Sequence, residues 1–183
     1  MNITAWPIRI IITGGTFDKD YDPLSGTLTF RDTHLARILD DVRLSVPVEL
    51  EINQLTDSLD MSDEQRMGVV EACLAAPERR VVVTHGTDTM TVTAGLVRER
   101  MVDGRIEAGA GPEEQRDKTI VFTGAMVPYS VSGSDAVFNL GCAISAVQLV
   151  APGVYVVMNG RVLPAGRVRK NRENGTFEVT DED

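Results

Sequence analysis

Short apolar segments rich in isoleucine and valine recur along the chain, and segments with helical patterns separate them. These apolar segments are residues 8–13, 48–55, 80–85, 119–124 and 153–159. Continuously apolar strands that alternate with helices are typical of a parallel sheet covered on both faces. We therefore expect an α/β fold with three α/β/α layers and a mainly parallel sheet, of the Rossmann or flavodoxin-like kind.

The segments between the strands carry recognisable helix signals. Ser62 with Gln65 predicts a capping box ahead of a helix over residues 67–75. Further helices are expected, one capped by Asp32 or Thr33 and ending at Leu39, and two over residues 91–101 and 134–150. The segment 134–150 is apolar on more than one face, which predicts that it packs against another subunit as well as against the sheet.

The length and charge of the chain exclude several classes of protein. Its 183 residues suit one domain, and residues 103–117 are interpreted as an exposed loop rather than a domain linker. The net charge of -9 would repel phosphate backbones and anionic lipids, so neither nucleic acid nor membrane is expected as a partner. The start of the sequence lacks signal-peptide features, and no stretch is long and apolar enough to span a bilayer. These observations favour a cytoplasmic protein.

Metal, cofactor and disulfide chemistry are not expected. Cys73 and Cys142 each lie in an apolar helical pattern, which indicates two buried, reduced thiols. His34 is assigned to a helix and His85 precedes a glycine, and neither has a third His or Cys ligand nearby for zinc. Neither Gly-x-Gly-x-x-Gly nor a Walker lysine follows the first strand, which argues against a nucleotide or flavin cofactor.

Hydroxyl and carboxylate side chains follow four of the predicted strands. The four strand ends carry Thr13-Gly14-Gly15-Thr16, Thr56-Asp57-Ser58, Thr84-His85-Gly86-Thr87-Asp88-Thr89 and Thr123-Gly124-Ala125. Taken singly, each run also suits a strand end, a turn or a helix cap. Capping does not require all four ends to carry such residues, however, and ligands of open α/β sheets bind beyond the carboxyl ends of the strands. The combination therefore favours a functional site at this edge.

Thr16 is the candidate nucleophile at this edge. The two glycines before it let the backbone turn sharply and leave its hydroxyl free. Tyr21, in a polar stretch interpreted as a mobile loop, is positioned to remove the hydroxyl proton, although a surface tyrosine is an equally good interpretation.

A second set of candidate residues comes from the third strand end. The adjacent Thr87 and Asp88 can orient a water or a ligand ammonium, and backbone amides there can face a developing oxyanion. Lys170 would complete a proton relay with them. Taken alone, a lysine in the basic run 167–170 is more often a solvated charge.

The runs Thr13-Gly14-Gly15-Thr16 and His85-Gly86-Thr87-Asp88-Thr89-Met90 together resemble the two signature motifs of the bacterial-type L-asparaginase family. The similarity continues, in the same order along nearly the whole chain, in Asp57-Ser58-Leu59-Asp60-Met61, Gly124-Ala125-Met126, residues 135–140 and Val156-Val157-Met158-Asn159. The spacing from Asn159 to Lys170 also fits the lysine of the family.

The resemblance implies cofactor-free hydrolysis of the side-chain amide of L-asparagine through an acyl-enzyme on threonine. It implies that Thr16 is the nucleophile with Tyr21 as its partner, and that Thr87, Asp88 and Lys170 form the second catalytic set. It also implies a homodimer or homotetramer. The substrate-binding positions that it implies are Ser58 for the α-carboxylate, Asp88 for the α-ammonium, the Ala125 carbonyl for the amide nitrogen and the Thr87 N–H for the oxyanion, with Asp57 and Gly86 beside them.

Two features depart from the family pattern. Leu59 follows Ser58 where the family is often polar, which removes a substrate contact. The family also has a smaller C-terminal domain that contributes to the neighbouring subunit's site, and residues 1–183 match only the large N-terminal domain. A second hypothesis is therefore a non-catalytic or partner-dependent amino-acid-binding module, either a sensor or an amidotransferase component.

Overall fold

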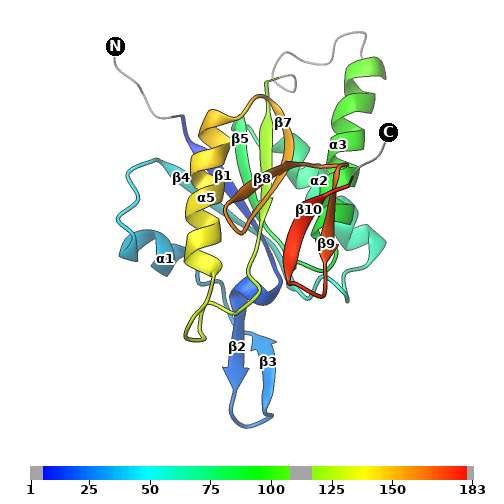
Figure 1. The fold of residues 1–183 in the computed structure, drawn as a ribbon. Coiled ribbons are helices and arrows are strands. Elements are labelled where there is room, and N and C mark those ends of the chain that lie inside the picture. The colour runs from blue at the N-terminus through cyan, green and yellow to red at the C-terminus, as the bar shows by residue number, and fades with distance from the viewer. Residues whose placement is uncertain (1–5, 108–116, 181–183) are drawn as a thin grey trace.

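The computed structural model describes residues 6–107 and 117–180, and its centre is a six-stranded sheet with the order β4-β1-β5-β6-β7-β8 (Figure 1). Neighbouring strands are parallel except for the pair β7 and β8. The mainly parallel sheet predicted from the sequence is therefore confirmed. Its strands are β1 (Ile8–Gly14), β4 (Val48–Thr56), β5 (Arg80–Thr84), β6 (Thr119–Thr123), β7 (Gly153–Met158) and β8 (Arg161–Pro164).

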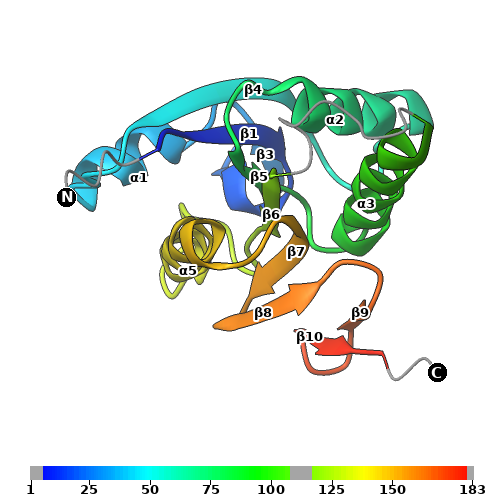
Figure 2. The ribbon, with the colours of Figure 1, turned by 90° about the horizontal axis from the view of Figure 1, so that it is seen from above.

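Helices cover both faces of this sheet, as Figure 2 shows. On one face lie α1 (Leu35–Asp41) and α5 (Ala136–Leu149), and on the other lie α2 (Asp63–Ala75) and α3 (Met90–Glu107). Side chains of one strand alternate between the two cores: Val82 packs with the α1 and α5 face, and Val81 and Val83 pack with the α2 and α3 face. The three-layer arrangement is thus confirmed. In the described residues, no helix combines the length and apolarity needed to cross a membrane.

The predicted cap of α2 is confirmed, whereas the N-cap of α1 is His34 rather than Asp32 or Thr33 and makes no side-chain capping bond. The Gln65 N–H donates to Ser62 Oγ at 3.2 Å and the Ser62 N–H donates to Gln65 Oε1 at 2.9 Å, which completes the predicted capping box. At the start of α1, the Leu35 N–H donates to Thr33 Oγ1 at 3.2 Å. His34 lies one residue before α1 rather than inside it.

Several segments interpreted as loops are regular structure. The helix α3 continues to Glu107, so the predicted loop 103–117 begins as helix, and residues 108–116 of it lie outside the described residues. The polar stretch around Tyr21 is a hairpin of β2 (Lys19–Asp22) and β3 (Thr27–Phe30), which follows the short 3-10 helix η1 (Thr16–Asp18). Residues 161–164, between β7 and the segment that carries Lys170, form the edge strand β8. Strands this short give little periodic signal, because their side chains are mostly partly exposed.

A second hairpin, of β9 (Val168–Asn171) and β10 (Thr176–Val179), packs on the α3 side of the sheet. Phe177 is 1% exposed and Val168 is 9% exposed, and both belong to the core under α2 and α3. Arg161 donates to the Phe177 carbonyl at 3.1 Å. The hairpin therefore has a fixed place against the body of the sheet.

The backbones that follow β1 and β5 come into direct contact. Gly15 has φ 72° and ψ -171°, a conformation that is essentially restricted to glycine. A Cβ added to Gly15 would lie 2.3 Å from the Gly86 nitrogen. No side chain fits between the two loops, so this position requires glycine for its space as well as for its φ.

We expect Gly15→Ala to destabilise the protein more than Gly26→Ala, its matched control. Both glycines have positive φ, 72° and 69°, so alanine is strained at either position, by about 1–2 kcal/mol or more. Only Gly15 adds a clash with backbone, since nothing lies within 4 Å of a Cβ on Gly26. Urea denaturation should show a further loss at Gly15 of about 1–3 kcal/mol. Equal losses in the two variants would contradict the close contact of the loops.

Candidate functional site

The loops after β1 and β5 meet at the carboxyl edge of the sheet, at the lower end of the view in Figure 1. In the strand order, β4 and β5 lie on opposite sides of β1, so the chain order reverses at this point. Such a reversal opens a crevice beyond the strand ends, where ligands of α/β proteins bind. Thr16 follows one of the two strands and Thr87 follows the other, so both predicted hydroxyls flank the reversal point.

Lys170 lies beside Thr87 and Asp88, although 83 residues separate it from Thr87 in sequence. Its Nζ donates to Thr87 Oγ1 at 2.8 Å and to Asp88 Oδ1 at 3.1 Å. The Lys170 side chain is 12% exposed, so the contact is largely shielded from water. The hairpin of β9 and β10 brings the lysine to this position.

Arg172 adds a second cation to the same carboxylate, and sequence reasoning missed it. Its Nη2 lies 3.5 Å from Asp88 Oδ1, and its side chain is 67% exposed. Asn171 shapes the turn that carries it, because Asn171 Oδ1 accepts the N–H groups of Glu173 and Asn174, both at 3.1 Å. The only sequence signal for this contact was that Arg172, a charged residue, lies two positions after Lys170.

Ser58 is buried against the backbone of Gly86. A Cβ on Gly86 would lie 2.5 Å from both Cβ and Oγ of Ser58, and Ser58 is only 2% exposed. The predicted binding positions Ser58, Gly86 and Thr87 therefore lie together, with the Ser58 hydroxyl against the loop that carries Thr87.

Both carboxylate oxygens of Asp57 bind groups of the same chain. One of its oxygens pairs with Lys19 Nζ, and the other accepts the Leu59 N–H at 2.9 Å. Burial alone would raise the pKa of Asp57, but the Lys19 ammonium and the Leu59 N–H outweigh it, so this pKa lies below its ordinary value. The carboxylate is therefore ionised at neutral pH and ties β2 to the loop after β4.

Thr16 and Tyr21 occupy different surroundings. Thr16 is the first residue of η1 and is partly buried, whereas Tyr21 lies in the β2–β3 hairpin with 59% of its surface exposed. Within the described part of the chain the two residues share no hydrogen bond. The hairpin is braced at its base, where Ser130 donates to the Lys19 carbonyl at 2.9 Å.

Ala125 is fully buried in the loop after β6. Hydrogen bonds with Asp135 and Asn139, at the start of α5, set the conformation of this loop. Asp135 accepts the Met126 N–H at 2.9 Å and the Val127 N–H at 3.0 Å. Asn139 donates to Asp135 at 2.8 Å and to the Gly124 carbonyl at 3.0 Å. Sequence reasoning gave neither Asp135 nor Asn139 a role, although both fall in the segment 135–140 that carries part of the resemblance.

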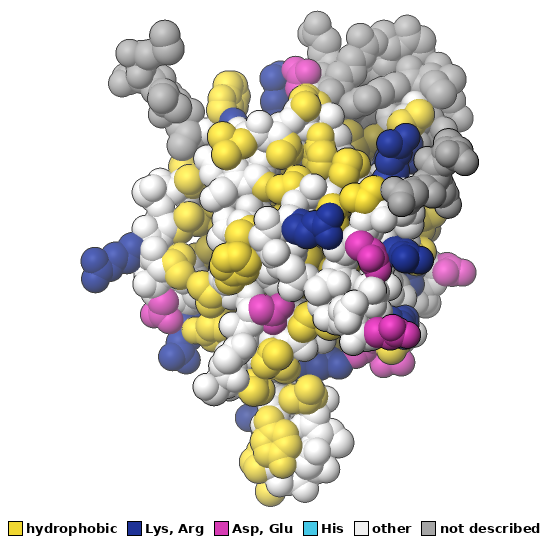
Figure 3. Space-filling view, in the orientation of Figure 1, with side chains coloured by type: hydrophobic (Ala, Val, Ile, Leu, Met, Phe, Trp, Pro, Cys, Tyr) yellow, Lys and Arg dark blue, Asp and Glu magenta, His cyan; other side chains and the backbone are white. Residues whose placement is uncertain are grey.

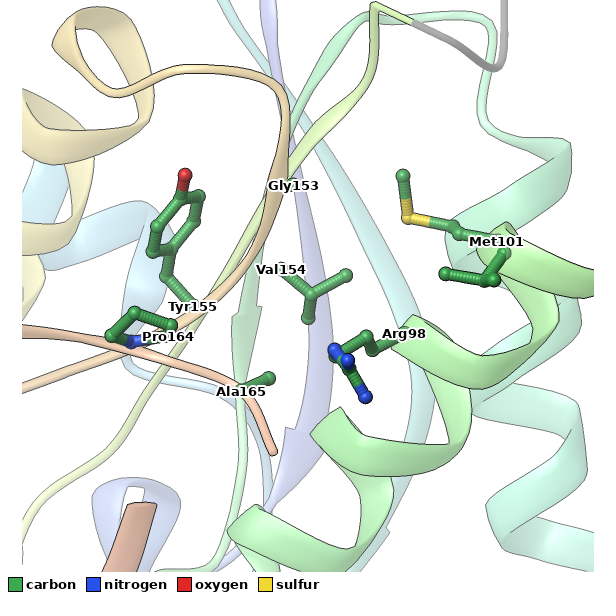
Figure 4. Close-up of a pocket in the computed structure, with 8 residues that line it drawn as sticks. Arg98, Met101, Gly153, Val154, Tyr155, Pro164 and Ala165 are labelled. Carbon is green, nitrogen blue, oxygen red and sulfur yellow. The ribbon is translucent and has the colours of Figure 1, made fainter. Parts of the chain in front are cut away.

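A cavity of about 250 Å³ lies at the opposite edge of the sheet (Figure 4). Arg98 and Met101 of α3 face Val154 of β7 across it, whereas the Tyr155 side chain points to the other side of β7. The lining is mostly apolar, and the Tyr155 hydroxyl donates a hydrogen bond to the Ala151 carbonyl at 3.0 Å. Because it lies far from the clustered hydroxyls and carboxylates, this cavity is not the candidate site.

For metals, the described residues include no group of three or more His, Cys, Asp or Glu side chains that could bind an ion.

Known proteins resemble the chain in both sequence and fold. It is 30% identical over 90 residues to an L-asparaginase of Thermococcus kodakarensis, a match that covers 49% of this chain and 24% of that protein. It is 29% identical over 165 residues to a glutamyl-tRNA(Gln) amidotransferase subunit of Methanococcus vannielii, which covers 85% of this chain and 34% of that protein. The structure of a probable cytoplasmic L-asparaginase from Campylobacter jejuni matches with a TM-score of 0.76 and 27% identity, over 96% of this chain and 53% of that one.

The chain spans between about a quarter and a half of the length of these relatives. The family described as Asparaginase, N-terminal, matches residues 7–180, which is nearly the whole chain. The matched region contains both strand-end loops and the hairpin that carries Lys170. The chain therefore belongs to the asparaginase family.

Proposed function

We propose that the protein is an amidohydrolase that converts L-asparagine to L-aspartate and ammonia through an acyl-enzyme on Thr16, without a metal or cofactor. The observation that carries the proposal is the contact of Lys170 Nζ with both Thr87 Oγ1, at 2.8 Å, and Asp88 Oδ1, at 3.1 Å. A largely buried ammonium beside a hydroxyl and a carboxylate is suited to proton transfer. Family membership and the adjacent loop with Thr16 support the same proposal.

In the first half of the proposed reaction, the Thr16 oxygen attacks the side-chain amide carbon of the substrate. The Thr16 proton passes to the departing nitrogen through Tyr21, which accepts one proton and gives another, and ammonia leaves. This step requires the exposed Tyr21 hairpin to approach Thr16 when substrate binds. The Thr87 N–H faces the oxyanion of the tetrahedral intermediate.

In the second half, water attacks the ester on Thr16. The cluster of Thr87, Asp88 and Lys170 relays a proton from this water to the Thr16 oxygen, which releases aspartate and restores the hydroxyl. In the Michaelis complex, Ser58 receives the α-carboxylate, Asp88 the α-ammonium and the Ala125 carbonyl the amide nitrogen. Asp57 and Gly86 complete this binding set, with Asp57 acting through its bond to the Leu59 N–H. Leu59 is 63% exposed and offers no polar contact to this substrate.

A second candidate function is a partner-dependent binding or ammonia-supplying module. It is favoured by the match to the glutamyl-tRNA(Gln) amidotransferase subunit over 85% of this chain. Such a module would bind asparagine or glutamine but release ammonia only with a partner protein. Ammonia release by the chain alone separates the two functions, because the module would release none without its partner. Assaying both amides also measures the preference between asparagine and glutamine, for which one methylene is worth about 1–3 kcal/mol.

Thr16→Ala and Lys170→Met are expected to remove most ammonia release from asparagine while the protein stays folded. Lys170→Met should lower turnover by roughly 10²–10⁴-fold, the usual contribution of an acid–base group, and Thr16→Ala should lower it at least as much because no acyl-enzyme can form. Ammonia release is measured with a coupled assay and folding with circular dichroism.

Thr27→Ala and Arg169→Met are the matched controls for these variants. Thr27 lies in the exposed hairpin, and Arg169 precedes Lys170 in β9 with 68% of its side chain exposed. Both controls should retain activity close to that of the wild type. Undiminished turnover in folded Thr16→Ala would refute the assignment of the nucleophile.

We further propose that the protein is a cytoplasmic homodimer or homotetramer. Hydrophobic side chains gather over α5 and β8 on the face seen in Figure 3. They include Phe138, 60% exposed, Val137, 38% exposed, and Val162, 43% exposed. Apolar surface of this kind marks an interaction site, and the apolar pattern of residues 134–150 predicts the same contact.

Phe138→Glu is expected to shift the assembly towards the monomer, because the new charge would be desolvated in the contact. Val42→Glu is the matched control, since Val42 is 45% exposed at the end of α1 and lies outside this surface. Light scattering at micromolar concentration measures both variants. A wild-type monomer under these conditions would rule the assembly out.

A further inference from the structure

Arg66, in the first turns of α2, is a buried cation that hydrogen-bonds to neutral groups. It is 8% exposed, and its Nη1 donates to Thr93 Oγ1 at 2.7 Å and to Thr89 Oγ1 at 3.1 Å. Its Nη2 reaches the Met61 carbonyl at 3.5 Å. Within the described residues no carboxylate pairs with it, although buried charges are usually paired. The arrangement therefore calls for a role beyond ion pairing.

The first contact leads from Arg66 to the loop after β4. A guanidinium only donates hydrogen bonds, so Thr89 Oγ1 accepts from Arg66 and directs its own proton elsewhere. That proton goes to the Ser58 carbonyl, which lies 3.0 Å from Thr89 Oγ1. Arg66 thus fixes the peptide that joins Ser58 and Leu59.

The second contact leads from Arg66 to the loop after β5. His85 is fully buried, with Nδ1 2.8 Å from the Gly86 carbonyl and Nε2 2.9 Å from Thr93 Oγ1. The carbonyl can only accept, so Nδ1 carries the proton and Nε2 of the neutral ring accepts from the Thr93 hydroxyl. Thr93 in turn accepts from Arg66, and His85 Nε2 at 2.9 Å is a nearer acceptor for the Thr93 proton than the Thr89 carbonyl at 3.5 Å.

The Gly86 carbonyl and the Thr87 N–H belong to one planar peptide. In a trans peptide these two groups point in opposite directions, so a bond to the carbonyl also sets the direction of the Thr87 N–H. Hydrogen bonds in series also strengthen one another. Two hydrogen-bonded chains from one guanidinium therefore end on the peptides beside Ser58 and Thr87.

We propose that Arg66 is a positioning residue that orients the Ser58 and Thr87 loops for substrate through Thr89 and through Thr93 and His85. This inference rests on the proposed function, in which Ser58 binds the α-carboxylate and the Thr87 N–H binds the oxyanion. Arg66 itself touches neither the substrate nor the reacting atoms.

The arrangement also keeps the His85 ring neutral. The pKa of His85 is lowered to about 4, mainly by burial and in addition by the positive charge of Arg66, while the bond to the Gly86 carbonyl opposes both effects. Arg66 is the charged group that α2 presents to the ring, whereas β6 presents Phe122 and α3 presents Thr93. Protonation would turn Nε2 into a donor and reverse the bond from Thr93.

Arg66→Met tests the inference, with Arg66→Lys and the exposed Arg37→Met as comparisons. Arg66→Met should lower kcat/KM for asparagine by roughly 10- to 100-fold, the cost of misplacing binding groups. It should also move the acid limb of the pH profile upwards, because loss of the Arg66 charge raises the His85 pKa above about 4, while burial still holds it below 6.5. Arg66→Lys keeps the charge but not the forked geometry, so it should retain the low His85 pKa and still lose kcat/KM. Arg37→Met should match the wild type.

The His85 pKa is measured directly by NMR, which is practical because the chain has 2 histidines. If Arg66→Met fails to fold, Thr93→Val interrupts the chain to His85 and Thr93→Ser restores its hydroxyl. A folded Arg66→Met or Thr93→Val with wild-type kcat/KM, pH profile and Thr87 amide shift would overturn the inference. A wild type that releases no ammonia, combined with shifted His85 and Thr87 resonances in the variants, would overturn the proposed function and sustain the positioning role.

Discussion

The contact between loop backbones at the carboxyl edge of the sheet is the constraint on which the candidate site depends. Gly15 lies against Gly86, and Gly86 lies against Ser58, at distances that leave no room for another carbon. A Cβ on Gly124 would similarly lie 2.4 Å from the His85 carbonyl. Four strand ends therefore form one closely packed layer. Since the polar groups project from these backbones, their spacing follows from the glycines rather than from attraction among the side chains.

Charges at this edge are mostly compensated within the chain. Lys19 pairs with Asp57, and Lys170 and Arg172 share Asp88. The contact of Arg172 is exposed and 3.5 Å long, so it contributes about 0–1 kcal/mol. The Lys170 contact is shorter and more buried. A ligand ammonium that approaches Asp88 would therefore displace Arg172 more readily than Lys170.

The layers of the fold could be predicted from the sequence because the long strands are continuously apolar and buried on both faces. The β2–β3 and β9–β10 hairpins could not, because four-residue strands of mixed polarity depend on contacts that only the folded chain supplies. Lys170 shows the same limit within the site. Local sequence favoured a solvated lysine, and only the resemblance placed it beside Thr87. Arg66 was missed because its partners lie on separate elements, while the roles of Thr16 and Tyr21 stay predictions.

Lys170 owes its position to hydrophobic anchoring more than to its ion pair. Burying a side chain such as Phe177 contributes about 1.5–3 kcal/mol, whereas a largely buried ion pair adds little net stability because the desolvation of both charges offsets their attraction. Phe177 lies directly opposite Lys170 in the β9–β10 pairing and reaches into the core under α2 and α3. The burial of Phe177 that stabilises the β9–β10 hairpin thus also places the Lys170 ammonium beside the loop after β5. Folding of this core and assembly of the candidate site are therefore coupled, because Val168 in β9 and Phe177 in β10 both hold the hairpin against the core.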